Sequence, residues 1–165
     1  LWYDGQKVPL RQLLKQWVAN HWCKANIACS AYIGQNYKNC KVVFNPIRLD
    51  VFKSADKFEQ SDRIIFFAGR FVSDKGVDLL LDAFHRLLSL VNSELPLKLV
   101  IAGGGPDEAS LKQQAENLKI NQLILWPGMI DQPSLVTFMH SSSIMVVPSR
   151  MEPMGMVVAE GLAAG

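Results

Sequence analysis

Residues 64–69 read Ile-Ile-Phe-Phe-Ala-Gly, a continuous apolar run closed by a glycine. Three more short runs follow it, at 97–102, 123–126 and 144–147, and Lys98 is their single charged residue. Runs of this length that are apolar at nearly every position are typical of strands buried on both faces of a parallel sheet. Helical patterns separate them, at about 77–91, 107–118 and 132–140. The alternation predicts an α/β domain built on a doubly wound parallel sheet.

The stretch before residue 60 is less regular and predicts smaller elements. A helical stripe of apolar residues follows Pro9, and its members are Leu10, Leu13, Leu14, Trp17 and Val18. We interpret this stripe as core packing, with attachment to a membrane surface as the alternative. Short strands are expected near 27–30 and 41–44, with a helical turn at about 31–37 between them.

A change of composition divides the chain. Residues 53–63 are polar and charged, which indicates a boundary between domains. We therefore expect residues 1–59 to be the end of one domain with its connection, and residues 60–165 to be a second domain. Residues 163–165 read Ala-Ala-Gly, where a helix would ordinarily lead into another strand. We accordingly expect the sheet domain to be incomplete at both ends and the chain to be a piece of something longer.

Composition argues against several classes of protein. Of the 165 residues, 49% are hydrophobic and 19% charged, as in a folded domain rather than a disordered one. A net charge of +2 without a basic block argues against a nucleic-acid partner. No apolar run reaches the roughly 18 residues of a membrane-spanning helix. Three cysteines, an odd number, favour a reducing compartment, so we expect a cytoplasmic protein.

A zinc site is not expected. The possible ligands His21, Cys23, Cys29 and Cys40 have spacings that match no zinc finger or ribbon. We interpret the three cysteines as small apolar fillers instead.

The residues after each predicted strand carry the candidate chemistry, because open parallel sheets bind ligands beyond the carboxyl ends of their strands. After the first strand, the loop from Gly69 to Gly76 holds Arg70 and Lys75. A guanidinium can bind two phosphate oxygens at once and an ammonium adds a point charge, so the pair indicates an anion site. The alternative is that both cations are simply solvated.

The second strand leads into Gly-Gly-Gly-Pro at 103–106, where a ligand could approach the backbone closely at Gly105. This loop is not a dinucleotide-binding fingerprint, because the third required glycine would fall at Glu108. Asp107 is expected to cap the helix that follows. The glycines therefore favour a ligand without indicating NAD.

The third strand is followed by the turn 127–131, which carries no reactive side chain. Its apolar groups and free backbone amides around Gly128 and Ile130 could hold a flat base. A turn that could hold a nucleobase thus follows the cations and the glycines along the chain.

The fourth strand leads into residues 149–161, where Glu152 lies in a loop and Glu160 about two turns into a helix predicted at 154–164. Unpaired N–H groups where this helix opens, at Gly155, favour an anion, most often phosphate. The two acids can accept hydrogen bonds from hydroxyl groups. A ligand with a phosphate group flanked by hydroxyl groups would suit this site, and a sugar nucleotide is such a ligand. The alternative is a solvated Glu152 and a Glu160 on the polar face of its helix.

Together these strand ends resemble the C-terminal domain of family four retaining glycosyltransferases of the GT-B class. The resemblance covers about residues 60–165, and its motifs are Gly69-Arg70, Lys75-Gly76, Gly103-Gly104-Gly105-Pro106, Glu152-Pro153-Met154-Gly155 and Glu160-Gly161. The two glutamates reproduce that family's pair of acids with seven residues between them. Two departures are Met154, where the family often has Phe, and Asn45-Pro46-Ile47, in place of a more usual Asn-Gly pair. The implied fold is Rossmann-like.

The resemblance also implies how the donor is held. Arg70 and Lys75, beside Gly69, would hold the diphosphate of a nucleotide sugar and stabilise it as the leaving group. The base would lie near Gly105 and the turn of Gly128 and Ile130.

The transferred sugar and the ribose of the nucleotide would be bound by the last stretch of the chain. Glu152 would bind hydroxyls of the transferred sugar, with the amides of Gly155, Met156 and Val157 near the sugar and the phosphate. Glu160 would bind the ribose hydroxyls. The sequence leaves open a different role for Glu152, as the nucleophile of a two-step retaining reaction.

The expected function of the full-length protein is transfer of a sugar (a hexosyltransferase-like activity), with retention, from a UDP-, GDP- or ADP-sugar to a glycan, lipid or small-molecule acceptor, without a cofactor or metal. The fragment alone is expected to be inactive. The alternative is a non-catalytic nucleotide-sugar-binding module, because the chain would lack most of the N-terminal domain that supplies the acceptor site in such enzymes. The resemblance also implies possible peripheral membrane association through that N-terminal part. An NAD-dependent enzyme is disfavoured by Glu108.

Overall fold

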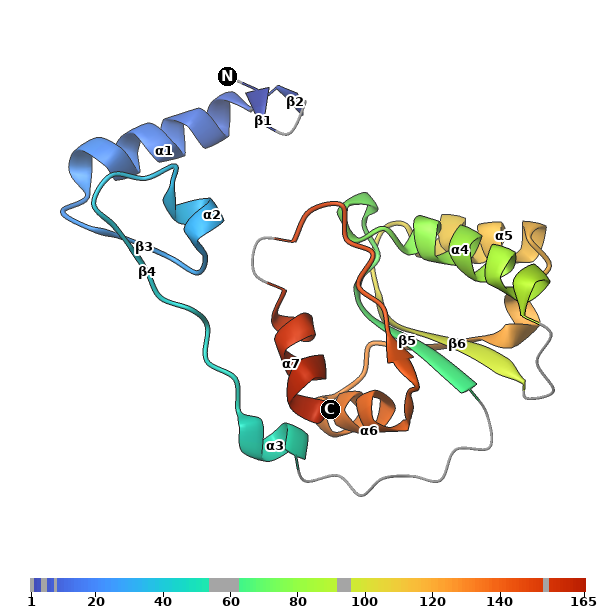
Figure 1. Ribbon diagram of the computed structural model, residues 1–165. Helices are drawn as coiled ribbons and strands as arrows, with labels where there is room; N and C mark the ends of the chain where they lie inside the picture. Colours follow the sequence, from blue (N-terminus) through green and yellow to red (C-terminus); the bar gives the residue numbers. More distant parts are fainter. Residues whose placement is uncertain (1, 4–5, 8, 54–62, 92–95, 153–154) are drawn as a thin grey trace. The chain divides into compact units, whose positions relative to one another are not determined.

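The structure is a computed structural model of the chain, and it describes residues 2–3, 6–7, 9–53, 63–91, 96–152 and 155–165. Contacts within the chain divide it into two compact units, Leu1–Pro46 and Ile47–Gly165. In Figure 1 the first unit is coloured blue to cyan, and the second runs from blue-green to red.

The first unit contains short elements. In chain order they are β1 Trp2–Tyr3, β2 Gln6–Lys7, α1 Leu10–Trp22, β3 Asn26–Ala28, α2 Ala31–Gly34 and β4 Cys40–Val42. β1 pairs with β2 in antiparallel fashion, and β3 pairs with β4 in parallel. The N-terminus of α2 is capped by Ser30 Oγ, which accepts a hydrogen bond from the Ile33 N–H at 3.3 Å. The two short strands and the helical turn expected from the sequence are therefore confirmed.

The interpretation of the α1 stripe as core packing is wrong for the residues that the structure describes. Leu10 is 83% exposed, Leu14 60% and Trp17 51%, and no residue of α1 is buried. The helix is attached through polar groups instead, since Gln16 Nε2 donates to the Asn36 carbonyl at 2.6 Å. Two paired strands of three residues each present too small a face to cover the apolar side of a 13-residue helix.

The second unit is a four-stranded parallel sheet in the order β7-β6-β5-β8. Its strands are β5 Arg63–Arg70, β6 Leu97–Gly104, β7 Ile124–Gly128 and β8 Ile144–Met145. Its helices are α3 Leu49–Lys53, α4 Val77–Leu90, α5 Glu108–Asn117, α6 Gln132–Ser141 and α7 Met156–Ala164, with 3₁₀ turns η1 Ser73–Lys75 and η2 Asn121–Leu123.

The two central phenylalanines of β5 show why the sheet is covered on both faces. Phe66 is 0% exposed and Phe67 1%, and successive side chains of a strand point to opposite faces. Phe67 packs in a core with α4 and α5, to which Leu81 contributes, whereas Phe66 packs in a second core with α3 and α6, to which Phe52 contributes. Figure 1 shows α4 and α5 on one side of the sheet and α6 and α7 on the other. The predicted doubly wound α/β fold is confirmed.

Most predicted elements lie within two residues of their observed bounds. The last strand is shorter than the expected 144–147, because regular pairing stops at Met145. The chain still runs beside β5 for another residue, since the Val146 N–H donates to the Phe66 carbonyl at 2.8 Å.

The predicted cap of α5 is wrong. Asp107 occupies the N-cap position, but its side chain makes no capping hydrogen bond. Its backbone angles, φ −86° and ψ 3°, lie outside the extended region from which an N-cap side chain reaches forward over the first turn. Asp131 does cap α6, because it has an extended backbone and accepts from the Ser134 N–H at 3.0 Å.

The domain boundary predicted at 59/60 falls within 54–62, outside the described residues. The contacts place the division between Pro46 and Ile47. α3 belongs to the sheet unit, because Phe52 is 1% exposed in the second core and its carbonyl accepts from His140 Nε2 at 2.7 Å. The connection thus enters the sheet unit before the polar stretch rather than after it.

Candidate functional site

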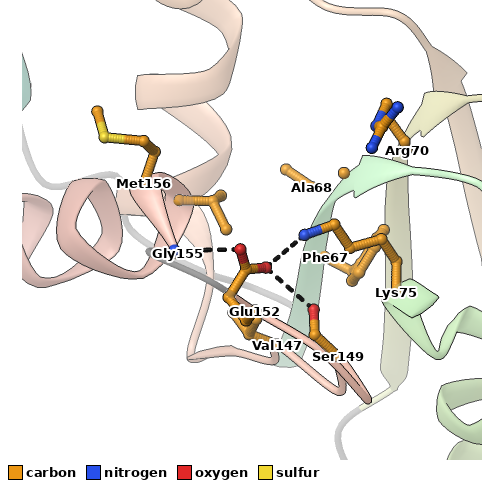
Figure 2. Close-up of a pocket in the computed structure, with 11 residues that line it drawn as sticks. Phe67, Ala68, Arg70, Lys75, Val147, Ser149, Glu152, Gly155 and Met156 are labelled. Atoms are coloured by element: carbon orange, nitrogen blue, oxygen red, sulfur yellow. Dashed lines mark hydrogen bonds and ion pairs between the residues drawn. The ribbon is translucent and has the colours of Figure 1, made fainter. Parts of the chain in front are cut away.

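A pocket of about 440 Å³ opens at the carboxyl ends of β5 and β8, which are neighbours in the sheet. Seven residues that the sequence singled out line it: Gly69, Arg70, Lys75, Glu152, Gly155, Met156 and Val157. Figure 2 shows Lys75, from the turn after β5, and Ser149 and Glu152, from the loop after β8, meeting in the pocket wall beside Gly155 at the start of α7. The structure thus brings together the predicted cations, one of the predicted acids and the predicted helix N-terminus.

Lys75 is placed by a tight turn after β5. It is the last residue of η1, and the turn ends at Gly76, whose φ of 66° lies in the left-handed region. A Cβ at this position would lie 2.2 Å from the Pro148 carbonyl oxygen. Glycine therefore allows both the turn and the close approach of the loop that follows β8.

Glu152 is held by donors from three directions, as Figure 2 shows. Its Oε2 accepts from Lys75 Nζ in an ion pair and from Ser149 Oγ at 3.2 Å. Its Oε1 accepts from the Gly155 N–H at 3.1 Å. The carboxylate therefore joins the cation of the first loop to the N-terminus of α7, where the helix dipole also favours a negative charge.

The surroundings of Glu152 favour its charged form. Burial raises the pKa of this carboxyl, but the hydrogen bond from Lys75, the Gly155 N–H, the Lys75 charge and Ser149 together outweigh it and leave the pKa below its ordinary value. Glu152 and Lys75 are only 24% and 20% exposed at their side chains. The pair is therefore a fixed part of the pocket wall rather than a mobile surface contact.

Arg70 is the unpaired cation of this pocket. It is the last residue of β5, in register with Gly104 of β6, and its side chain is exposed. Within the described part of the chain, its guanidinium makes no hydrogen bond or ion pair. Its donors are therefore available to an anion that enters the pocket.

The start of α7 adds backbone donors. Gly155 is the N-cap, with φ 56° and ψ 56°, and Met156 and Val157 follow it in the pocket wall. The N–H groups of Met156 and Val157 precede the first regular hydrogen bond of the helix, whereas the Val158 N–H already donates to the Gly155 carbonyl at 2.9 Å. The positive end of α7 thus points at the same space as Arg70 and Lys75.

The bonds that join the two loops of this site were not predicted from the sequence. Arg150 donates to both carboxylate oxygens of Asp78, at 2.8 and 2.6 Å, and to the Ser73 carbonyl at 2.7 Å. Its backbone N–H donates to the Asp74 carbonyl at 2.8 Å. The signal in the sequence was a cation two residues before Glu152 and an acid in the first turn of α4, but only the order of strands in the sheet makes them neighbours.

The three residues proposed for the base do not line this pocket. A Cβ on Gly105 would lie 2.4 Å from the Phe71 carbonyl oxygen, so the close approach that this glycine allows is to the chain's own backbone. Ile130 is partly buried against the second core. Gly128 has a φ of 74°, and a Cβ added to it would meet no atom within 4 Å, so it serves the turn geometry.

Glu160 is the fifth residue of α7, just over one turn into the helix, and is also outside the pocket lining. Burial raises the pKa of this carboxyl above its ordinary value. Glu152 and Glu160 thus have opposite electrostatic environments, although they form one sequence motif. The structure does not bring Glu160 to the cations.

The described residues contain neither a metal-binding cluster nor a membrane-spanning helix. Among them, no three or more histidine, cysteine, aspartate or glutamate side chains are grouped in a way that suits a metal ion. No helix in this part of the chain is long and apolar enough to cross a membrane.

Residues 50–165, well over half of the chain, match the family described as Glycosyl transferases group 1. The chain belongs to this family. Over 114 residues the chain is 30% identical to an uncharacterized glycosyltransferase, MJ1607, of Methanocaldococcus jannaschii. That match covers 69% of this chain and 28% of the relative.

A second relative is the mannosylfructose-phosphate synthase of Agrobacterium fabrum, 28% identical over 115 residues, which cover 66% of this chain and 25% of that protein. The group 1 glycosyl transferase chain thus spans about a quarter of the length of these relatives.

Among solved structures, S. aureus TarM in a complex that includes UDP superimposes with a TM-score of 0.82 at 16% identity, over 98% of this chain and 32% of that one. At this identity the likeness concerns the fold, which is that of the GT-B glycosyltransferases. The pocket of this chain therefore lies on the carboxyl edge of a Rossmann-like sheet, where such folds bind ligands.

Proposed function

We propose that this chain is the donor-binding half of a retaining glycosyltransferase, which transfers a sugar from a nucleotide-diphosphate sugar to a hydroxyl of a glycan, lipid or small-molecule acceptor. One observation carries the proposal. Arg70, Lys75 and the N-terminus of α7 surround a single pocket at the carboxyl edge of the sheet.

These three groups suit the chemistry of a departing diphosphate. When the bond between the sugar and the diphosphate breaks, negative charge grows on the leaving phosphate oxygens. Fixed cations and helix N–H groups stabilise that charge more than the charge of the ground state. Arg70, which has no partner among the described side chains, would bind the phosphate first, and Lys75 would divide its donors between the phosphate and Glu152.

The contacts of Glu152 favour a role in binding sugar hydroxyls. Both of its oxygens already accept hydrogen bonds, from Lys75, Ser149 and Gly155, and these lower its nucleophilicity by stabilising the charged form. An oxygen with a remaining lone pair can still accept from a hydroxyl. If a covalent glycosyl adduct on Glu152 were trapped and identified by mass spectrometry, this role would be replaced by that of a nucleophile.

Kinetics of variants test the leaving-group role in a longer protein that contains this chain. We expect Arg70→Ala and Lys75→Ala to lower kcat by about 10²–10³-fold, as for loss of one oxyanion-stabilising donor, and to weaken donor binding less. The same assay, read by NMR of the anomeric proton of the product, should show retention. Unchanged turnover in both variants would remove the two cations from the mechanism.

The proposal assigns charge neutralisation to protein groups and therefore expects no requirement for a divalent metal. Turnover should be the same with EDTA and with added Mg²⁺ or Mn²⁺. A loss of turnover in EDTA that added metal restores would show that a metal ion takes over part of the role given to Arg70 and Lys75.

A second candidate is a nucleotide-sugar-binding module without catalysis of its own. It is favoured by the location of the pocket, whose lining residues all belong to the sheet unit and account for donor binding without an acceptor site. Calorimetric titration with UDP-, GDP- and ADP-sugars, paired with a donor hydrolysis assay, separates the two. Binding with turnover supports the enzyme, whereas binding without turnover supports the module.

We also propose a cytoplasmic location, with attachment to a membrane surface as an addition that other parts of a longer protein would supply. The three cysteines, Cys23, Cys29 and Cys40, are unpaired thiols, as in a reducing compartment. Fractionation of cells that express a tagged protein tests this location.

A further inference from the structure

The pocket is assembled from two loops that are far apart in the sequence. Lys75 and Glu152 are 77 residues apart, and each lies on a loop that leaves a different strand. A shift of either loop would separate the cation from the carboxylate. Something outside the pocket has to keep the loops in register.

Arg150 connects these loops at four points, in addition to the ion pair itself. Its guanidinium binds both carboxylate oxygens of Asp78 and the Ser73 carbonyl, and its backbone N–H binds the Asp74 carbonyl. Ser73 and Asp74 are the two residues of η1 that precede Lys75. Arg150 itself is two residues before Glu152, so its contacts join the segment that carries Glu152 to the turn that carries Lys75.

We propose that Arg150 is a positioning residue, which holds the loop of Glu152 against the turn of Lys75 and so sets the geometry of the donor pocket. This inference rests on the proposed function for its consequence, but its structural content is independent of that function. Arg150 does not line the pocket, and it acts through Lys75 and Glu152.

An ordinary surface ion pair would not have this effect. Arg48 and Asp50 form such a pair, through one bond of 2.9 Å with side chains 71% and 69% exposed. Arg150 and Asp78 are 42% and 43% exposed and are bound by two parallel bonds, to which the carbonyl contact adds a third direction. A planar guanidinium with several fixed donors defines an orientation, which a single exposed contact does not.

The first test measures the pKa of Glu152 by carbon-13 NMR of its side-chain carboxyl in the whole chain. In the unaltered protein, the contacts with Lys75 and Gly155 hold this pKa below its ordinary value. Arg150→Ala should loosen these contacts, so that the pKa of Glu152 rises. In a Lys75→Ala background the same substitution should change the pKa much less, because the contact through which Arg150 acts is already absent.

The second test measures the affinity for UDP, GDP and ADP by calorimetry. We expect Arg150→Ala to weaken binding of whichever nucleotide binds by about tenfold, because misplaced groups lose much of their effect. Asp78→Asn should weaken it in the same direction, and Arg150→Lys should retain only part of the affinity, since an ammonium cannot span both oxygens. Arg48→Ala is the matched control and should leave the affinity and the pKa of Glu152 unchanged.

The outcomes separate the possible roles. If Arg150→Ala lowers the melting temperature while the pKa of Glu152 and the nucleotide affinity stay unchanged, Arg150 only adds stability and the proposal is wrong. If Arg150→Ala weakens binding and Asp78→Asn does not, Arg150 contacts the ligand directly, which also overturns it. If no nucleotide binds the unaltered chain, the proposed function fails, while the pKa of Glu152 still decides whether Arg150 positions the pair.

Discussion

At the scale of single residues, the site depends on a carboxylate that has more donors around it than a solvated acid would. Glu152 receives hydrogen bonds from Lys75, Ser149 and the Gly155 N–H. We expect Glu152→Gln to lower the free energy of unfolding by about 1–2 kcal/mol at pH 7, because a neutral amide weakens the charge-assisted bonds and turns an NH₂ toward one of the donors. Urea denaturation of both proteins at pH 7 gives this difference.

The charge of Glu152 should make the stability of the protein depend on pH. Its pKa is lowered on folding from an ordinary value of 4.5, so the stability it contributes is present above about pH 4.5 and is lost as the pH falls through its folded-state pKa. The difference in unfolding free energy between the unaltered protein and Glu152→Gln should therefore shrink below that pH. A difference that stays constant from pH 7 down to pH 3 would mean that the charge of Glu152 contributes nothing.

Glu160 should behave in the opposite sense. Burial raises its pKa from the ordinary 4.5, so its protonated form is compatible with folding and its ionised form disfavours the folded state as the pH rises through the raised pKa. Glu160→Gln is therefore expected to increase the free energy of unfolding at pH 7, with no difference below about pH 4.5. Destabilisation at pH 7 would show that this acid has a stabilising partner in the folded protein.

At the scale of elements, the turn after β5 and the loop after β8 fit together only because a glycine stands between them. Gly76→Ala would require a non-glycine residue at φ 66° and a Cβ 2.2 Å from the Pro148 carbonyl oxygen. Left-handed backbone alone costs about 1–2 kcal/mol, and the overlap adds to it by forcing the loops apart. We expect Gly76→Ala to lower the free energy of unfolding by more than about 2 kcal/mol.

Gly128→Ala is the control for this prediction. Gly128 also has a left-handed φ, 74°, but no atom lies within 4 Å of the added Cβ. Gly128→Ala should lower the free energy of unfolding by about 1–2 kcal/mol, the cost of the left-handed backbone conformation alone. Equal costs for the two substitutions, measured by urea denaturation, would show that the approach of Pro148 to Gly76 is unimportant.

The strands and longer helices of the sheet unit could be predicted from the sequence, because strands with nearly continuous apolar residues and helices with an apolar side follow directly from burial. The short helix α3 was not predicted, because its residues have the composition of a turn and a polar boundary. The spatial order of the strands could not. From the sequence, the cations after β5 and the acids after β8 are separate groups, but β8 lies beside β5 and brings Glu152 to Lys75. The bonds of Arg150 were missed for the same reason.

Two other features could not be predicted from the sequence, for physical reasons. The pattern of α1 shows that one of its sides is apolar, but it contains no information about what covers that side, and Leu10 and Trp17 prove exposed among the described residues. Asp107 is a residue type that caps helices, but capping also needs an extended backbone, which the loop after β6 does not provide here.

At the scale of the whole molecule, the sheet unit is expected to fold with α3 as part of it. A chain truncated to begin at Ile47 keeps Phe52 in the second core, whereas one that begins at residue 60 loses it. Loss of a fully buried phenylalanine costs about 3–5 kcal/mol, so the shorter chain should be less stable by about that amount. Equal stability would favour a boundary at 59/60, and Phe52→Ala in the longer chain controls for the change in length.

The central claim is that Arg70, Lys75 and the start of α7 bind the diphosphate of a sugar donor. Calorimetric titration of UDP, GDP and ADP, each against its own nucleoside, tests it most directly. We predict that at least one nucleoside diphosphate binds, that Arg70→Ala and Lys75→Ala each weaken its binding by about tenfold through loss of charge-assisted bonds, and that nucleoside binding is unchanged. Lys75→Ala should have the larger effect, because it also leaves the Glu152 charge uncompensated beside the phosphate. Binding of the diphosphate that neither substitution weakens would contradict the account.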